Sequence, residues 1–155
     1  MIERSRSART LVGAMLMVAG LASMASAQSA QPSVTRLSLE GVVDPFVADY
    51  LRNGIQGASD ADAVLLTIDT PGGLDSSMRE IIKAIQNSKV PVLCYVAPEG
   101  ARAASAGAYI LVSCHVAAMA PATAVGASTP VGIGGVTLSK KIEEDAAAYM
   151  RTLAQ

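Results

Sequence analysis

The sequence predicts an α/β fold with a mainly parallel sheet. Two nearly continuous apolar runs, residues 63–69 (AVLLTID) and 90–97 (VPVLCYVA), have the composition of strands buried on both faces. Between them, apolar residues recur at the spacing of an amphipathic helix. A strand, a helix and a second strand in this order are joined by a right-handed crossover. This connection makes the two strands parallel and lays the helix on the sheet.

Residues 1–27 have the three parts of a secretory signal peptide. Arginines at positions 4, 6 and 9 precede an uncharged run over residues 11–24, and Ala25-Ser26-Ala27 supplies the small residues of a cleavage site. An uncleaved anchor is the alternative, because the apolar run is near the lower limit for a bilayer span. We expect cleavage after Ala27 and an exported, extracytoplasmic protein.

Without that segment, which carries three Arg and one Glu, the formal net charge falls from −1 to −3. No basic cluster is left, so nucleic acid is not an expected partner. After a polar spacer at residues 28–33, residues 34–155 are enough for one domain. Its core must come from Val, Leu, Ile and Ala, because aromatic residues make up only 3% of the sequence.

The first strand and helix of this domain follow the spacer. Residues 34–40 alternate apolar and polar side chains, which is typical of a half-buried strand. Asp44-Pro45 then supplies an N-cap and a first helical residue. The apolar residues after this cap fall on one predicted helix face, which consists of Phe46, Val47, Tyr50, Leu51 and Ile55.

A second helix is predicted between the two apolar runs. Ser77 and Glu80 have the spacing of a capping box, which predicts the start of this helix. Its apolar stripe consists of Leu74, Met78, Ile81, Ile82 and Ile85.

After the strand at residues 90–97, Pro98-Glu99-Gly100 breaks the chain, and residues 103–113 are predicted to be helical. Short strands are expected at residues 116–119 and 124–127, followed by a loop with glycines at 132, 134 and 135. A last helix begins near Ser139 and carries an apolar side made of Ile142, Ala146, Tyr149, Met150 and Leu153. Its periodicity continues to Gln155 without a C-cap, so we expect either a fragment of a longer protein or a helix that docks on another element.

The two cysteines, Cys94 and Cys114, lie in apolar sequence without a CxxC spacing or a nearby pair of histidines. A metal site is therefore not expected. Buried free thiols are the favoured prediction. A disulfide stays open as the alternative because the protein is predicted to be exported.

Ser105 is the candidate nucleophile. It lies among very small residues, from Ala103 to Ala108, where a helix is predicted to begin, so a substrate backbone can approach it closely. Gly72-Gly73 follows the strand predicted at residues 63–69, and Ser105 follows the next one, at residues 90–97. Parallel strands bring their C-terminal ends to one edge of the sheet. The N–H groups of the two glycines can then form an oxyanion hole beside Ser105. The alternatives are a small-residue packing segment at Ser105 and an ordinary tight turn at Pro71-Gly72-Gly73.

Three ordered motifs carry a family resemblance: Ile68-Asp69-Thr70-Pro71-Gly72-Gly73, Ala103-Ala104-Ser105-Ala106-Gly107-Ala108 and Met119-Ala120-Pro121-x-Thr123-x-Val125-Gly126-Ala127. Together they resemble the Clp protease/crotonase superfamily, and within it the NfeD-type membrane-bound serine proteases. The resemblance covers residues 34–155. It implies a Clp-protease-like domain of ββα-type repeats whose C-terminal part is missing. It also implies a homodimer, with membrane association through the missing region.

The resemblance further implies a catalytic Ser-Lys dyad. Ser105 is the nucleophile, Lys141 is the general base, and the N–H groups of Gly72 or Gly73 and of Ala106 form the oxyanion hole. A catalytic lysine must be desolvated so that its amine is neutral. The helical pattern alone does not separate Lys141 from the adjacent Lys140, and solvated lysines on a first helical turn remain the alternative. The only histidine, His115, is expected to have a structural role.

These roles predict a serine endopeptidase without a cofactor that cleaves hydrophobic segments of membrane-associated, stomatin-like proteins. Two other functions stay open. A non-catalytic remnant or binding module of the same fold would account for the missing C-terminal part. A crotonase-like acyl-CoA enzyme would use the same kind of oxyanion hole, but the Ala-Ser-Ala-Gly segment and the signal peptide argue against it.

Overall fold

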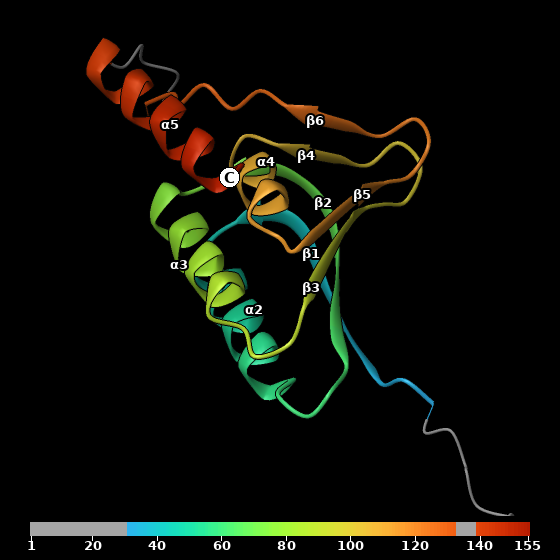
Figure 1. Cartoon of the computed structure of the whole chain (residues 1–155). Helices are drawn as coiled ribbons and strands as arrows, with labels where there is room; N and C mark the ends of the chain where they lie inside the picture. Colours follow the sequence, from blue (N-terminus) through green and yellow to red (C-terminus); the bar gives the residue numbers. More distant parts are fainter. Residues whose placement is uncertain (1–30, 133–138) are drawn as a thin grey trace, which may run out of the picture. The chain divides into compact units, whose positions relative to one another are not determined.

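A computed structural model describes residues 31–132 and 139–155, and residues 32–155 form one compact unit. The predicted signal peptide and most of the predicted glycine-rich loop lie outside the described residues. Six strands and four helices make up the unit (Figure 1). In chain order they are β1 (Val34–Val43), α2 (Pro45–Gly57), β2 (Ala63–Gly73), α3 (Asp75–Gln86), β3 (Val92–Val96), β4 (Arg102–Ala104), α4 (Ala106–Val112), β5 (Val116–Met119), β6 (Ala124–Gly126) and α5 (Lys140–Leu153).

All strand pairs are parallel, which confirms the predicted fold class. β2 is the central strand, with β1 on one side along most of its length. On its other side it pairs first with β3 over residues 64–68 and then, at Thr70, with Ala103 of β4. The sheet therefore forks. β5 extends the β3 branch and β6 extends the β4 branch.

α2 and α3 lie side by side against one face of the sheet (Figure 1). The Asp44 carboxylate caps α2 by accepting a hydrogen bond from the N–H of Val47 at 2.9 Å, and Pro45 is the first helical residue, as predicted. The predicted apolar face of α2 is wrong at two positions. Phe46 is 84% exposed and Tyr50 is also exposed, because Phe46 lies about 140° around the helix from the buried Leu51.

α3 begins two residues before the predicted capping box. Its N-cap is Leu74, and Ser77 is buried without making a capping hydrogen bond. The predicted stripe is buried apart from Leu74. These side chains pack against the core side of the sheet, which consists of Leu37, Leu39, Val64, Leu66, Ile68, Val92, Cys94 and Val96.

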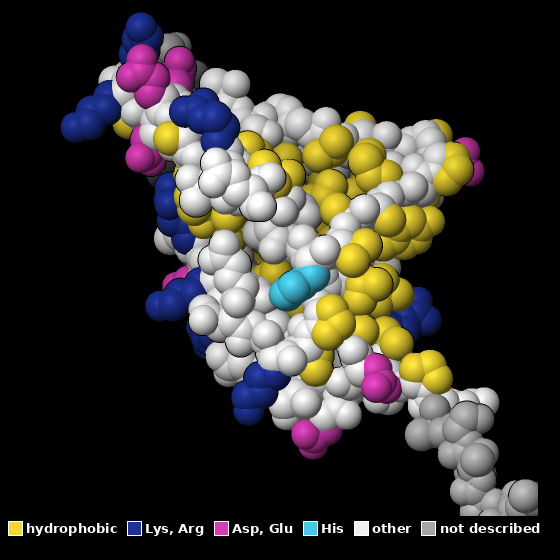
Figure 2. Space-filling view, viewed as in Figure 1, with side chains coloured by type: hydrophobic (Ala, Val, Ile, Leu, Met, Phe, Trp, Pro, Cys, Tyr) yellow, Lys and Arg dark blue, Asp and Glu magenta, His cyan; other side chains and the backbone are white. Residues whose placement is uncertain are grey.

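The prediction that the apolar strands are buried on both faces is half wrong. Residues on the second face of β2 and β3, such as Leu65 and Tyr95, are only half-buried, and all of β5 is exposed. Figure 2 shows hydrophobic side chains gathered over the strands, while charged groups lie mainly on α5 and along the helices. An apolar run therefore predicted the strands correctly but did not specify how many of their faces are covered.

Residues 103–113 are not one helix, as predicted, but the short strand β4 followed by α4. Nothing in Arg102-Ala103-Ala104 favours a strand locally. The segment is extended because Ala103 pairs with Thr70 of β2 on one side and with Val125 of β6 on the other. Tertiary pairing overrides the helical preference of alanine here. The other short strands, β5 and β6, are close to their predicted positions.

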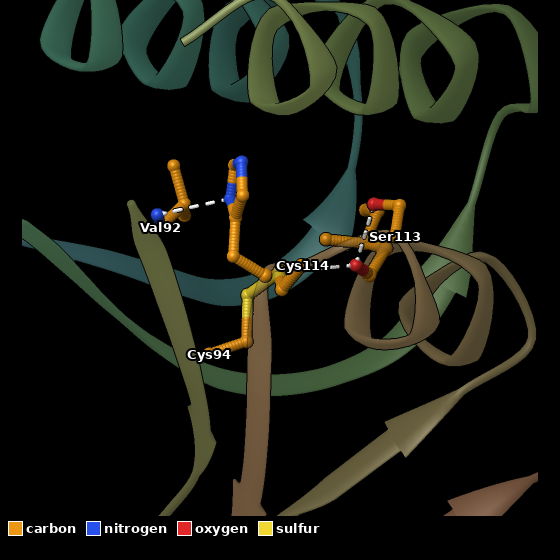
Figure 3. Close-up of a disulfide and its surroundings, with 6 residues drawn as sticks. Val92, Cys94, Ser113 and Cys114 are labelled. Carbon is orange, nitrogen blue, oxygen red and sulfur yellow. Dashed lines mark hydrogen bonds between the residues drawn. A yellow bond between two sulfur atoms is a disulfide. The ribbon is translucent and has the colours of Figure 1, made fainter. Parts of the chain in front are cut away.

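The favoured prediction of free thiols is wrong, because Cys94 and Cys114 form a disulfide (Figure 3). β3 and β5 are neighbours, and this pairing brings Cys114 to Cys94, with their Cα atoms 6.0 Å apart. His115 has the predicted structural role. Its Nδ1 accepts a hydrogen bond from the N–H of Val92, and its own N–H donates to the Val92 carbonyl, each at 3.1 Å.

Candidate active site

Ser105 lies at the junction of β4 and α4 in a strained backbone conformation. Its φ is 52° and its ψ is −118°, a region that residues other than glycine rarely adopt. Its N–H donates to the Gly126 carbonyl on β6 at 2.8 Å, and its own carbonyl accepts from the N–H of Ala108 at 3.0 Å. A strained strand-to-helix turn of this kind exposes the nucleophilic serine of α/β-hydrolases. The junction therefore presents the hydroxyl in a way that a nucleophile requires.

Gly72 and Gly73 lie directly beside this serine at the end of β2. A Cβ atom on Gly72 would lie 2.6 Å from Ser105 Cβ and 3.0 Å from its Oγ, and Gly72 has a φ of 105°. A Cβ atom on Gly73 would overlap the backbone of Val43 on β1. Both positions accept only glycine, because any side chain would collide with the serine or with the neighbouring strand.

The two glycine N–H groups point in different directions. The N–H of Gly72 is already donated to Thr70 Oγ1 at 3.0 Å, and that of Leu74 to the Val43 carbonyl of β1 at 2.9 Å. The Gly72 carbonyl also lies 3.4 Å from Thr70 Oγ1. In a trans peptide bond the N–H points opposite to the carbonyl, so the N–H of Gly73 is directed away from Thr70. Gly73 is exposed, whereas Gly72 is buried.

A cleft of about 290 Å³ lies over Ser105. Three of the predicted site residues line it, namely Gly73, Ser105 and Ala106, while Gly72 lies behind the serine. A larger hollow of about 740 Å³ lies between α2 and α3, but it contains none of the predicted site residues. The other residues around the smaller cleft are Leu74, Asp75, Met78, Arg79, Tyr109, Ser128, Pro130, Val131, Gly132, Ala146 and Tyr149.

One wall of the cleft is a cluster of aromatic and charged side chains. Tyr109 stacks on Tyr149 of α5 with ring centroids 6.0 Å apart, and the guanidinium of Arg79 lies 4.3 Å from the centre of the Tyr149 ring. Arg79 also bonds Asp75 at 2.8 Å, and this hydrogen bond raises the pKa of Arg79. The Tyr109 hydroxyl is 3.2 Å from the carbonyls of both Ser128 and Ala146.

Burial raises the pKa of both Tyr109 and Tyr149, so each ring stays a neutral hydrogen-bond donor across the physiological range. Tyr109, Tyr149 and Arg79 were not predicted to be site residues. One signal was present, because Tyr109 follows Ser105 by four residues and therefore lies one helical turn beyond it.

The structure does not bring either candidate lysine into the cleft. Lys140 and Lys141 are both exposed on the first turn of α5, and neither lines the cleft. Lys140 is 88% exposed and pairs with Glu144 of the same helix at 3.5 Å. Residues 133–138, which precede this turn, lie outside the described residues. Lys141 therefore remains a predicted base.

Within residues 31–132 and 139–155, no three His, Cys, Asp or Glu side chains are grouped as a metal ion would require. No helix in the same residues is long and apolar enough to cross a membrane.

Two curated proteins are similar in sequence to this chain. One is the membrane-bound protease PH1510 of Pyrococcus horikoshii, 39% identical over 124 residues, which are 76% of this chain and 28% of PH1510. The other is the membrane protein NfeD1b of Bacillus subtilis, 34% identical over 120 residues, which are 76% of this chain and 27% of NfeD1b. The chain thus spans less than a third of the length of either relative.

Solved structures share the fold. One is a lysine-to-alanine mutant of the 1510-N membrane-bound stomatin-specific protease with a substrate peptide, matched with a TM-score of 0.77 and 37% identity over 81% of this chain and 61% of that one. A serine-to-alanine mutant of 1510-N matches with a TM-score of 0.76 and 37% identity over 81% of this chain and 64% of that one. These matches confirm the predicted Clp-protease-like fold.

The family model described as the NfeD1b N-terminal domain matches residues 33–155. This match covers the same strands, helices and Ser105 cleft, so the chain belongs to the NfeD1b N-terminal domain family.

Proposed function

We propose that this chain is the protease domain of a membrane-associated serine endopeptidase in which Ser105 is the nucleophile and Lys141 the general base. The observation that carries the proposal is the strained backbone of Ser105, whose side chain lies against the Gly72-Gly73 turn. The protease names of PH1510 and 1510-N support it, because both proteins are similar to this chain over most of its compact unit.

In the proposed reaction, the neutral amine of Lys141 accepts the proton of the Ser105 hydroxyl while Oγ bonds to the substrate carbonyl carbon. The carbonyl oxygen becomes an oxyanion, which the N–H groups of Gly73 and Ala106 stabilise. We assign Gly73 in preference to Gly72, because the N–H of Gly72 is already donated to Thr70. The Lys141 ammonium then protonates the leaving amine as the peptide bond breaks. Water, deprotonated by the same lysine, releases the acyl group.

Lys141 is favoured over Lys140 for two reasons. The amine of Lys140 is paired with Glu144 at the helix surface, whereas no such ion pair involves Lys141 within residues 31–132 and 139–155. The family resemblance also aligns Lys141 with the catalytic lysine. The 1510-N structure that holds a substrate peptide is a lysine-to-alanine mutant, which agrees with a catalytic lysine in that protein. The mechanism requires the Lys141 amine to come within hydrogen-bond reach of Ser105 Oγ, and such contacts are often longer in the free enzyme.

The proposed substrates are hydrophobic segments of membrane-associated, stomatin-like proteins. The cleft lining supports this class, since Leu74, Met78, Pro130 and Val131 give it apolar walls. The similar protein 1510-N is a stomatin-specific protease, which supports the same class of substrates for this chain. An extended peptide could enter by pairing with a strand edge. We also propose that the protein is exported, associates with a membrane and forms a homodimer.

The exposure of both lysines favours one alternative, a non-catalytic binding module of the same fold. A rhodamine-fluorophosphonate probe distinguishes the two functions, because it reacts covalently with an activated serine. We expect a labelled Ser105 peptide by mass spectrometry in the wild-type chain and none in Ser105→Ala. Absence of label from a chain that circular dichroism shows to be folded would refute the peptidase and support the binding module.

The lysine assignment has a matched pair of variants. Lys141→Ala should lose at least 100-fold in labelling rate, a loss of about 10²-fold or more being usual for a general base. Lys140→Ala should keep the wild-type rate, because its amine is paired with Glu144. The opposite result would assign the base to Lys140.

A further inference from the structure

Thr70 is a fully buried polar residue next to the candidate site. Its exposed fraction is 0%, and it lies on β2 two residues before Gly72. It does not line the Ser105 cleft, and the proposed reaction gives it no role. A buried hydroxyl is costly unless both its proton and its lone pairs have partners, so the identity of those partners is informative.

The Thr70 hydroxyl joins two backbone segments. It donates its one proton to the Gly41 carbonyl of β1 at 2.5 Å and accepts the N–H of Gly72 at 3.0 Å. The second of these bonds spans the turn in which Gly72 has a positive φ. It holds the Gly72 N–H on the side of Thr70, and the Gly72 carbonyl is also 3.4 Å from the same hydroxyl. Because N–H and carbonyl point to opposite sides of a trans peptide bond, the N–H of Gly73 points away from Thr70.

The methyl group of Thr70 contacts a third segment. Its Cγ2 lies directly over the Cα of Gly107 in the first turn of α4, where a Cβ atom would collide with it. The backbone of Thr70 pairs with Ala103 of β4. One buried side chain therefore contacts β1, the Gly72 turn and the helix that follows Ser105.

We propose that Thr70 is a positioning residue for the oxyanion hole. Its hydroxyl fixes the conformation of Gly72, and this conformation directs the N–H of Gly73 toward the carbonyl that Ser105 attacks. The inference rests on the proposed peptidase function for its catalytic consequence. Its structural part, the fixed turn, is independent of that function.

Three variants separate this role from ordinary packing. Thr70→Val keeps the shape of the side chain and removes the hydroxyl, whereas Thr70→Ser keeps the hydroxyl and removes the methyl group. Thr67→Val is the matched control. Thr67 lies on the same strand and donates to the Leu37 carbonyl of β1 at 3.2 Å, and its hydroxyl makes no hydrogen bond to the site within the described residues. Loss of its hydroxyl should alter stability without altering the turn.

The first measurement is amide hydrogen exchange of the full chain, which does not depend on catalysis. We expect the Gly72 amide, which donates to the Thr70 hydroxyl, to exchange at least 10-fold faster in Thr70→Val than in the wild-type chain, and at an unchanged rate in Thr67→Val. Unchanged exchange in a folded Thr70→Val chain would overturn the proposal. This holds even if the wild-type chain does not react with fluorophosphonate, a result that would count only against the peptidase function.

The second measurement is the kinetics of fluorophosphonate labelling at Ser105. A misdirected donor lowers the maximal rate constant, kinact, by about 10- to 100-fold, while the half-saturating probe concentration KI stays the same. We expect this in Thr70→Val and not in Thr70→Ser or Thr67→Val. A wild-type kinact in Thr70→Val would overturn the proposal. A loss of kinact in Thr70→Ser would also overturn it, and that arm remains decisive if Thr70→Val does not fold.

Discussion

Reduction of the Cys94–Cys114 disulfide should lower the free energy of unfolding by about 3 kcal/mol. The two cysteines are 20 residues apart in the sequence, and closing a loop of that length in the unfolded chain removes conformational entropy worth roughly 3 kcal/mol at 25 °C. The loop encloses β4, Ser105 and α4.

Urea unfolding with and without a phosphine reductant, followed by far-UV circular dichroism, measures this difference. With a denaturant slope of about 1–3 kcal/mol per molar urea, a loss of about 3 kcal/mol shifts the midpoint down by about 1–3 M. The control is the double variant Cys94→Ala/Cys114→Ala, whose midpoint should not respond to the reductant. Cys94 is buried in the core, so the absolute stability of the double variant also includes a packing loss.

Two results would refute the reasoning. Equal midpoints for the oxidised and the reduced chain would mean that the closed loop does not constrain the unfolded state. Two free thiols in the folded, non-reduced chain, counted by alkylation and mass spectrometry, would mean that the pair is not oxidised. The pairing of β5 with β3 would then be the only reason why the two cysteines lie close together.

Two further predictions concern the site and its aromatic wall. Gly72→Ala should abolish fluorophosphonate labelling of Ser105, because the new Cβ would lie 3.0 Å from Oγ, whereas Gly100→Ala should not. Gly100 also has a positive φ, but a Cβ atom there would meet open space. Both variants should therefore lose about 1–2 kcal/mol to backbone strain, but only Gly72→Ala blocks the serine. Equal labelling of the two variants would contradict the prediction. Burial raises the pKa of Tyr109 and Tyr149, so their contribution to stability is complete below the ordinary tyrosine pKa of about 10 and is lost as the pH rises through the higher folded-state values. The melting temperature of Tyr109→Phe/Tyr149→Phe should therefore fall less steeply above about pH 10 than that of the wild-type chain, and equal slopes would argue against this linkage.

Predictions from the sequence succeeded where a local pattern carries the same information as the fold. The Asp44-Pro45 pair defines the start of α2 through hydrogen-bond geometry that does not depend on distant residues. The apolar runs predicted β2 and β3 for a similar reason, since few environments other than a buried sheet suit them. β4 was missed because its extended backbone depends on two neighbouring strands, which no local pattern reveals.

The same distinction applies to the site. A topological rule brought the Gly72-Gly73 turn next to Ser105, and the structure has them in contact. The positive φ of Ser105 was not predictable, because it follows from the turn between β4 and α4. Thr70 was missed for another reason. In the sequence it is one polar residue at the end of a strand, and its importance appears only when its partners on β1 and at Gly72 are known.

Tyr109 gives a physical reason why the nucleophile and the predicted base depend on one another. It lies one turn after Ser105 on α4, and its hydroxyl donates toward the Ala146 carbonyl of α5 at 3.2 Å. Ala146 is five residues beyond Lys141, about 7.5 Å along the helix axis. The helix that would supply the base is therefore docked on the helix that follows the serine. The same phenol also reaches the Ser128 carbonyl, but one hydroxyl proton serves only one carbonyl fully at a time. The docking of α5 is thus coupled to the position of Ser128, which follows β6. Because Ser128 lines the cleft, this coupling links the position of Lys141 to the walls of the cleft.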